Sequence, residues 1–435
     1  MKILIINANM HYKHTLTSQL LYKLNSNPIL VLQQLAAATP KEHTVQLIDD
    51  RYDNPIVKHK VDLVGISTVT PSSPRAYEIA DIYRKQGVPV VLGGIHPSSV
   101  PNEAKQHADA VVIGEAERSW PQVIKDVQQN TLKPFYTPEP YVNPIDIPEP
   151  RRDLLRIRPL FSAVAPSRGC PYHCSFCTLT HLHGASYRPR PVENVVQEIK
   201  HTPRKFLVFL HDASLTINKN YAKKLFKEMK LLKKNFIAYG SAPVLAKDEE
   251  LVKLSREAGC VMWCIGFESI CQESLKSDAH KGYTVESYEK MVKNIKKYHM
   301  NVFGSFVLGF DHDTTDMFDK TLQAAYDYGI DAAEFNILTP FPITRLFKQL
   351  EKEGRILTRD WEKYDLHHVV YQPKKMTPEE LYDGVAEIST KFYSPINVIS
   401  RIANVTFKTR RFPNILVIGA MNSIMARFHL EFSIL

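Results

Sequence analysis

Three of the six cysteines of this 435-residue chain stand together in one short stretch. In SRGCPYHCSFC, residues 167–177, Cys170, Cys174 and Cys177 are spaced as C-x3-C-x2-C. Thiolates at such spacings can wrap one iron–sulfur cubane, because each ligand must reach a different iron from within one loop. Three thiolates leave one of the four irons without a protein ligand, and an open coordination position is where a metal centre can react. The spacing therefore predicts a catalytic [4Fe-4S] cluster.

Other uses of these cysteines fit the sequence less well. Buried structural cysteines would not need this spacing, and a disulfide would leave an odd thiol. The N-terminal MKILIINANMHYKH has too short an apolar run for a signal peptide, so we expect a cytoplasmic chain with reduced thiols. A zinc site would need a fourth ligand, and three histidines are near: His173, His181 and His183. Structural zinc usually draws its ligands as two separated pairs, which favours the cluster.

From residue 161 onward, apolar strands alternate with helices at intervals of roughly 30 residues. The expected strands lie near 161–165 and at 206–210, 236–240, 261–268, 302–310 and 332–338. The helix expected between two of them, 248–259, begins at an Asp and ends at a Gly. Six such units predict a partial β/α barrel, whose active site lies at the carboxyl ends of its strands. The three cysteines directly follow the first strand, so the cluster would lie at that end.

The first part of the chain predicts a second α/β unit. Residues 1–135 are expected to form a doubly wound, Rossmann-like domain whose strands are apolar on both faces. These strands are expected at 3–6, 44–48, 62–67, 88–94 and 108–114. Residues 136–160 are proline-dense without a helical period, which is typical of a linker. The barrel would then occupy 161–355, and 356–435 would form a small, mostly helical C-terminal region.

Composition limits the partners that this chain can have. Hydrophobic residues make up 44% and charged residues 23%, which is ordinary for a globular protein. The formal charge is +9, but no nucleic-acid motif and no long basic run are present, so we expect no nucleic-acid partner. No stretch reaches the ~20 apolar residues of a membrane span. The apolar last stretch, 412–435, is expected to dock as a helix, with peripheral membrane contact as the alternative.

The cysteine spacing, with the aromatic Phe176 before the last cysteine, resembles the signature of the radical SAM enzymes. The resemblance runs across residues 160–340. It implies that the unique iron binds the amino and carboxylate groups of S-adenosylmethionine (SAM). It also implies that an electron from an external donor, such as flavodoxin or ferredoxin, cleaves SAM to give a 5′-deoxyadenosyl radical.

Three stretches after barrel strands resemble the SAM-binding loops of that family. LHDASL follows the second strand and makes Asp212 the candidate beside the SAM amino group, although His211 departs from the acid common there. IGFESI follows the fourth strand and would place Glu268 near the SAM ribose or amino acid moiety, unless it caps the next helix. In GSFVLGF, Gly304 and Gly309 would let the adenine approach the fifth strand closely.

Other features near this region stay open. TPFP, residues 339–342, resembles the family's loop after the sixth strand, but relatives usually continue with Gly where this chain has Ile343. Arg188 and Arg190 would either neutralise a carboxylate or phosphate near the cluster or belong to a solvated helix entrance. The remaining three cysteines predict no second cluster, because the first ends a helix and the second lies inside an apolar strand, where small buried thiols are common. They are Cys260, Cys264 and Cys271.

An α/β domain ahead of a radical SAM barrel, joined by a proline-rich linker, resembles the cobalamin-binding subfamily. Small or polar residues follow its third, fourth and fifth strands, where doubly wound sheets bind ligands. They would admit a corrin ring and its nucleotide tail: Ser67, Thr68, Thr70, Gly93, Gly94, His96, Gly114 and Glu115. The D-x-H-x-x-G motif that supplies a cobalt ligand elsewhere is absent, and His11 and His14 do not fit it. The domain would either bind cobalamin with no protein nitrogen below the cobalt or be a relic.

The stretch that begins with TPFPITRLF resembles the C-terminal part of a subgroup that includes hopanoid C-2 methylases. Taken together, the resemblance implies a cobalamin-dependent radical SAM methyltransferase that acts on an unactivated carbon of a small-molecule or lipid substrate. Two enzyme alternatives stay open. One is a radical SAM cyclase, oxidase or rearrangement enzyme with the same cofactors, and the other is a non-methylating enzyme with a vestigial cobalamin domain. A non-catalytic cobalamin or iron–sulfur sensor is a different class of alternative.

Overall fold

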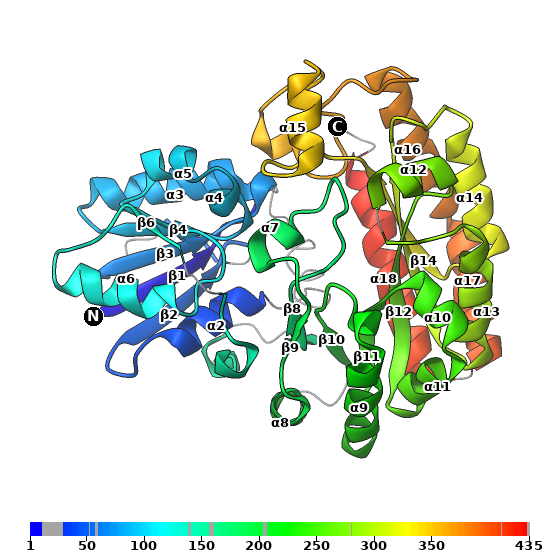
Figure 1. Ribbon diagram of the computed structural model, residues 1–435, viewed down its shortest axis with the longest axis horizontal. Helices are drawn as coiled ribbons and strands as arrows, with labels where there is room; N and C mark the ends of the chain where they lie inside the picture. The colour runs from blue at the N-terminus through cyan, green and yellow to red at the C-terminus, as the bar shows by residue number, and fades with distance from the viewer. Residues whose placement is uncertain are drawn as a thin grey trace.

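Two parallel six-stranded sheets organise the chain in the computed structural model (Figure 1). The structure describes residues 1–10, 29–51, 53–56, 60–137, 141–155, 161–202, 207–279, 281–409 and 411–432. His11 and His14 lie outside these ranges, as do parts of the expected linker. Figure 1 shows the first sheet on the left, the second on the right, and α7, β8 and β9 between them.

The first sheet has the order β2-β1-β3-β4-β5-β6, and all its pairs are parallel. Its strands are β1 (Lys2–Asn7), β2 (Thr44–Asp49), β3 (Leu63–Ser67), β4 (Val90–Gly93), β5 (Ala110–Val112) and β6 (Phe135–Tyr136). Its helices are α2 (Leu30–Ala38), α3 (Ser73–Lys85), α4 (Ile95–Ser99), α5 (Pro101–His107) and α6 (Ser119–Gln128). Separate apolar cores fill its two faces, as the doubly wound prediction requires, so that prediction is confirmed.

The strand order reverses between β1 and β3, which creates the place where open α/β sheets bind ligands. β1 pairs with β2 on one side and with β3 on the other, both in parallel. The connections therefore leave this point in opposite directions and open a crevice at the carboxyl ends of the strands. One strand, β6, lies where the sequence predicted the start of the linker. Its pairing with β5 is non-local, and two residues give too short a pattern to predict a strand.

The second sheet is the predicted partial barrel, with the order β14-β13-β12-β11-β10-β7 and only parallel pairs. Its strands are β7 (Phe161–Val164), β10 (Leu207–Leu210), β11 (Phe236–Gly240), β12 (Cys260–Glu268), β13 (Asn301–Leu308) and β14 (Ala332–Ile337). The helices of the successive units include α8 (Val192–His201), α9 (Lys219–Met229), α11 (Glu249–Glu257), α13 (Glu286–Lys297) and α14 (Met317–Asp327). The Asp predicted to begin one of these helices does so: Asp248 accepts a hydrogen bond from the backbone of Leu251 at the start of α11.

The C-terminal region is helical and closes the open side of the barrel. It contains α15 (Arg345–Lys352), α16 (Pro378–Phe392), α17 (Pro395–Thr409) and α18 (Phe412–Phe432). Asn414 on α18 donates to the backbone oxygens of Val261 at 3.3 Å and His299 at 3.0 Å. Val417 and Ile418 are buried against the inner face of the barrel strands. The docked-helix prediction is therefore confirmed, and no helix among the described residues is long and apolar enough to cross a membrane.

The turn after β14 contains an unusual backbone conformation at Ile343, whose φ is +75°. Left-handed backbone costs a β-branched residue about 1–2 kcal/mol, because its Cβ crowds the following carbonyl. We expect Ile343→Gly to raise the free energy of unfolding by about 1 kcal/mol, measured by urea denaturation. Gly329, at φ +72° with open space around it, is the reverse control. Gly329→Ala should lower stability by about the same amount, and a destabilised Ile343→Gly protein would contradict the argument.

Candidate active site: two adjoining cavities

Two cavities meet between the sheets. The sheet cavity, of about 650 Å³, is bounded by the carboxyl ends of β1, β3, β4 and β5 and by the start of the barrel. The cysteine cavity, of about 480 Å³, is bounded by the cysteine loop and the inner face of the barrel. Leu179, Ala213 and Tyr239 line both. A molecule held at this junction would face both cavities.

The three predicted cluster ligands lie together on the wall of the cysteine cavity. Cys170 and Cys174 are buried and Cys177 is partly buried. Burial raises the pKa of the Cys174 thiol to about 12, so a bound metal would be needed to hold it as the thiolate. Among the described residues, no three His, Cys, Asp or Glu side chains are close enough to ligate a single ion. Three thiols carried into the cavity by one loop are a donor set that suits a multi-iron cluster.

The backbone before the first cysteine permits glycine alone. Gly169 has φ +79°, and a Cβ there would lie 2.1 Å from the backbone oxygen of Ser186. This close approach follows from the antiparallel pairing of β8 (Ser167–Arg168) with β9 (Arg188–Pro189). The pairing fixes the start of the cysteine loop beside the segment that returns from α7 (Leu179–His183). The loop geometry is therefore set by the chain itself.

A buried ion pair lies beside the thiols. Lys281 donates to Glu268 at 2.5 Å, and both residues line the cysteine cavity. Glu268 has φ +61° at a register shift between β12 and β13, which turns its side chain toward the cavity. The charge of Lys281 lowers the pKa of all three thiols, against the larger opposing effect of burial. A lysine in AHKGY carries no pattern, so sequence reasoning missed it.

Glu268 lines the cysteine cavity, and its alternative role as a helix cap is wrong. The next helix, α12 (Gln272–Ser274), has Cys271 at its N-cap without a side-chain cap bond. Glu268 therefore does not cap it. Its carboxylate faces the cavity while paired with Lys281, which leaves acceptor capacity for a ligand. Its assignment to SAM stays a prediction.

Asp212 opens on the sheet cavity, while the adjoining Ala213 lines both cavities. Its carboxyl accepts hydrogen bonds from Ser167 at 2.6 Å, from the Tyr187 hydroxyl at 3.2 Å and from the Ser214 backbone at 3.0 Å. Burial outweighs these bonds and raises the pKa of Asp212 to about 6. No cation among the described residues pairs with Asp212, and a buried carboxylate of this kind is the group expected to meet a cationic ligand such as an amine.

An Asp with a raised pKa destabilises the fold at high pH. The native pKa of about 6 lies above the ordinary 3.8, so the penalty is absent below pH 3.8 and complete above about pH 6. We expect Asp212→Asn to stabilise the SAM-free protein at pH 8 by about 1–2 kcal/mol, after discounting for partial solvent screening. Urea denaturation at about pH 3 should show almost no gain. A less stable variant at pH 8 would contradict this, and weaker SAM binding would support the assignment of Asp212.

Most of the residues predicted for cobalamin line the sheet cavity. Six of the eight do so: Ser67, Thr68, Gly93, Gly94, Gly114 and Glu115. Gly114, at φ +78°, offers an open surface, because a Cβ there would meet only the Leu182 oxygen at 3.7 Å. The cavity also reaches Gly65 and Trp120, between the sheet and the helices α2 and α6. The glycines leave an open surface that suits a flat ring, and the extension of the cavity toward Gly65 and Trp120 suits the tail that the ring carries.

Thr70 and His96 are not on the wall of this cavity. Both are buried, and the His96 ring lies 3.2 Å from the carboxylate of Glu103 and packs on the edge of Trp361. Trp361 also donates to Glu103 at 2.9 Å. These contacts join the C-terminal region to the first sheet, so the structure gives His96 a packing role. Strand-end position predicted its neighbourhood but not the direction of its side chain.

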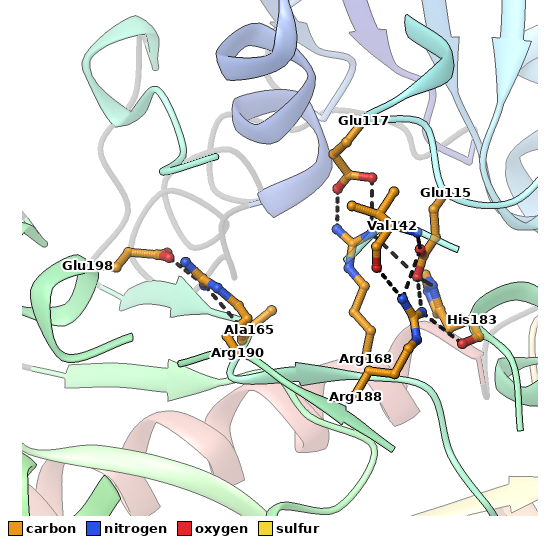
Figure 2. A network of polar contacts seen from close by, with 9 residues as sticks. All are labelled: Glu115, Glu117, Val142, Ala165, Arg168, His183, Arg188, Arg190 and Glu198. Carbon is orange, nitrogen blue, oxygen red and sulfur yellow. Dashed lines mark hydrogen bonds and ion pairs between the residues drawn. The ribbon is translucent and has the colours of Figure 1, made fainter. Parts of the chain in front are cut away.

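Glu115 forms the centre of a network that joins the loop after β5 of the first sheet to α7 and the β8–β9 pair (Figure 2). Its side chain is fully buried and accepts hydrogen bonds from Arg188 at 2.5 Å, from the Val142 backbone at 2.9 Å and from His183 at 3.1 Å. These cationic and polar donors overcome burial and lower the pKa of Glu115 to about 2. The carboxylate is therefore held by the protein itself, rather than being free to bind cobalamin.

The same network reaches the cysteine loop. Arg168 donates from two nitrogens to Glu117, one of them at 3.0 Å, and lies 3.6 Å from Glu115 (Figure 2). Arg168 is separated from Cys170 by a single glycine. The network therefore ties the loop that carries the thiols to the loop that follows β5. We call these residues the Glu115 latch: Glu115, Glu117, Arg168, His183 and Arg188.

The two arginines of the YRPRP stretch neutralise carboxylates of the protein. Arg188 belongs to the Glu115 latch, and Arg190 donates to buried Glu198 at 2.6 Å and to the Ala165 oxygen at 3.0 Å (Figure 2). Arg190 is itself buried. Neither arginine is at a solvated helix entrance, so that alternative is wrong. Both arginines therefore neutralise carboxylates of the protein itself, Glu115 and Glu198.

The other sequence features have structural surroundings. Gly304 faces Phe306 and Phe267, and Gly309, at φ +102°, faces Tyr371 and Leu381, so neither lies on the wall of the two cavities. Their assignment to adenine stays a prediction. Of the remaining cysteines, Cys260 is buried in the barrel core, Cys271 contacts Glu273, and Cys264 lines the cysteine cavity below the loop.

Comparison with known families matches three parts of the chain. The radical SAM superfamily matches residues 164–325, the B12 binding domain matches 30–124, and a domain of unknown function, DUF4070, matches 344–425. The chain is 31% identical over 421 residues to the bacteriochlorophyllide d C-8(2)-methyltransferase of Chlorobaculum tepidum, covering 88% of this chain and 92% of that protein. It is 24% identical over 342 residues to the hopanoid C-2 methylase of Rhodopseudomonas palustris, covering 75% and 64%.

A solved structure has the same overall architecture. The radical S-adenosylmethionine methyltransferase TsrM from Kitasatospora setae, with cobalamin and a [4Fe-4S] cluster bound, superposes with a TM-score of 0.68. The alignment covers 99% of each chain at 16% sequence identity. The arrangement of a doubly wound sheet beside a partial barrel is therefore shared.

Proposed function

This chain belongs to the cobalamin-binding radical SAM family, and from that premise we propose that it transfers a methyl group to an unactivated carbon of an apolar small molecule. As a member, it is an enzyme that uses a [4Fe-4S] cluster, SAM and cobalamin. The observation that carries the proposal is the junction of the two cavities at Leu179, Ala213 and Tyr239. A substrate carbon at this junction would face the radical source on one side and the methyl donor on the other.

When bound, the cluster and SAM supply a radical that removes a hydrogen atom, and cobalamin supplies the methyl group. Cys170, Cys174 and Cys177 would hold the cluster, with Lys281 balancing part of their negative charge. Glu268 keeps Lys281 ionised in this buried place. The Tyr239 side chain is 37% exposed, and its strand faces the cavities, so its exposed surface is available to orient a substrate. Apolar barrel side chains such as Phe209 exclude water from the junction.

The electron donor and the location are finer parts of this proposal. We propose an external acidic donor of the flavodoxin or ferredoxin kind, since the formal charge of +9 favours its approach. Pro171 and His173 of the cysteine loop are exposed, which gives such a donor a short route to the cluster. On α17, the side chains of Ile396 and Phe407 are 78% and 77% exposed, beside exposed Lys408. These side chains support peripheral contact between a cytoplasmic protein and a membrane.

Product analysis tests the proposal and separates its alternatives. The anaerobically reconstituted protein would be reduced with dithionite in the presence of SAM, methylcobalamin and candidate acceptors. Acceptors would begin with a bacteriochlorophyllide and a hopanoid, because two relatives are named for them. Methyl transfer predicts both S-adenosylhomocysteine and 5′-deoxyadenosine, together with a methylated product. Formation of 5′-deoxyadenosine and altered substrate alone would indicate a cyclase, oxidase or rearrangement enzyme, and no SAM cleavage would contradict catalysis.

A further inference from the structure

An acidic side chain faces the inside of the barrel at a height set by the strand register. Glu334 on β14 pairs in register with Ser305 on β13, which pairs with Gly266 on β12. Glu334, Ser305 and Gly266 all line the cysteine cavity. One inward position below, Cys264 pairs with Phe303 on the cavity floor. Glu334 therefore lies between the floor and the level of Glu268, where the barrel opens toward the cluster loop.

Glu334 has no cation to balance it among the described residues. Its side-chain hydrogen bonds come from the neutral groups of Ser305 and Asn336. The other glutamate of this cavity, Glu268, has Lys281 as its partner. Burial of Glu334 raises its pKa, which expresses the cost of keeping a carboxylate there. A buried acid with an unfavourable charge, in a cavity, is a candidate for ligand recognition.

Apolar side chains form much of the wall of the cysteine cavity. The inward side chains of neighbouring strands line the cavity: Phe161, Phe209, Ile237, Cys264 and Phe303. α18 supplies Met421, Ile424 and Met425 on the same wall. Met425 and Met421 pack on the apolar cluster that includes Phe303, so α18 forms part of the wall of the cysteine cavity. The cysteine cavity therefore joins apolar walls to an acidic group, Glu334, that has no cationic partner among the described residues.

We propose that Glu334 anchors a substrate amine, and that α18 selects for an apolar body on the same molecule. This rests on the proposed function and adds a substrate class to it: an apolar molecule with a primary or secondary ammonium group. An ammonium supplies the positive charge that Ser305 and Asn336 lack, and it converts the unfavourable acid into a buried ion pair with hydrogen bonds. A neutral donor would leave the carboxylate charge uncompensated.

A matched pair of probes tests this without knowledge of the natural substrate. n-Octylamine and n-octanol have the same chain and differ in the terminal group. Their binding would be measured by calorimetry on the anaerobic protein loaded with cluster, cobalamin and SAM, without reductant. We expect octylamine to bind at least about 10-fold more tightly, since a hydrogen bond to a charged group is worth about 1.5–3 kcal/mol.

Three variants locate the effect. Glu334→Gln keeps the shape of the side chain. It should remove the preference for octylamine and leave the affinity for octanol unchanged. Glu379→Gln, at an exposed position on α16, should keep the preference, which controls for general attraction of cations. Met421→Trp should weaken the binding of both probes, because the larger side chain fills part of the cysteine cavity. Circular dichroism would confirm that each variant is folded.

Equal affinities of the two probes for the wild-type protein would overturn the inference. A preference for octylamine that persists in the Glu334→Gln protein would also overturn it. If that variant in addition binds SAM more weakly, the Glu334 carboxyl serves SAM rather than the amine. Wild-type protein that binds cobalamin and cleaves SAM but shows no amine preference would refute this inference alone. Failure to bind cobalamin or cleave SAM would refute the proposed function instead.

Discussion

Replacing Cys174 with serine is expected to abolish the formation of 5′-deoxyadenosine from SAM. The serine hydroxyl is a much poorer iron ligand than a thiolate, and only two of the three thiols of the cysteine loop would remain. We expect iron and sulfide content to fall together with the activity. The measurement is 5′-deoxyadenosine by chromatography after anaerobic reconstitution and reduction.

Cys271 provides the matched control for this substitution. It is partly buried, contacts Glu273 and does not line the cysteine cavity. Cys271→Ser should therefore keep the iron content and the SAM cleavage of the wild-type protein. A Cys174→Ser protein with full iron and activity would refute the ligand assignment. Equal losses in the two variants would point to general damage of the fold instead.

The Glu115→Gln protein is expected to lose about 3–5 kcal/mol of stability and to bind cobalamin more weakly. The substitution removes the carboxylate that balances Arg188 and contacts Arg168 and His183 in a buried place, and uncompensated buried charge is costly. It also loosens the connection between the loop after β5 and the cysteine loop. Urea denaturation measures the first effect, and a cobalamin titration followed by absorbance measures the second.

An exposed ion pair serves as the control for the latch. Glu193 pairs with Lys224 at 2.8 Å, but their side chains are 70% and 60% exposed. Such pairs contribute about 0–1 kcal/mol, so Glu193→Gln should change little. Similar losses from Glu115→Gln and Glu193→Gln would contradict the importance of burial. Unchanged cobalamin affinity in Glu115→Gln would show that the latch does not help to form the cofactor site.

The contribution of the latch should depend on pH in a defined direction. The pKa of Glu115 is lowered from its ordinary 4.5 to about 2, so its stabilisation is complete above pH 4.5. It is lost as the pH falls through that interval toward 2. The stability difference between wild-type and Glu115→Gln protein should therefore stay constant from about pH 5 to 7 and shrink below pH 4.5. A difference that grows on acidification would contradict this sign.

The parts of the fold that follow local rules could be predicted from the sequence. Buried parallel strands such as LVGIS at 63–67 are apolar at successive positions, and Asp248 marks the start of α11 as a capping residue should. The spacing of the three cysteines predicted that one loop would carry them to one place. These signals lie within short segments, so no knowledge of distant contacts was needed.

The missing parts depend on contacts between distant segments. Lys281 reaches Glu268 from a loop without a motif, and Arg188 on β9 reaches Glu115 in the loop after β5. The position of His96 after a strand end could be predicted from the sequence. The direction of its side chain could not, because it depends on packing against Trp361 from the C-terminal region. Such pairings leave no periodic trace in the sequence. The structure was needed to separate residues that line a cavity from neighbours that stabilise it.

The proposed function requires that cobalamin occupies the sheet cavity beside a radical SAM cluster. Its most direct test is the cobalamin content of protein purified anaerobically after expression with cobalamin available, measured from the absorption spectrum. We expect about one cobalamin per chain. Gly93→Leu, which places a side chain in the cavity where a Cβ has room, should lose cobalamin and keep its iron. Wild-type protein with an intact cluster and no cobalamin would refute cobalamin-dependent methyl transfer by this protein.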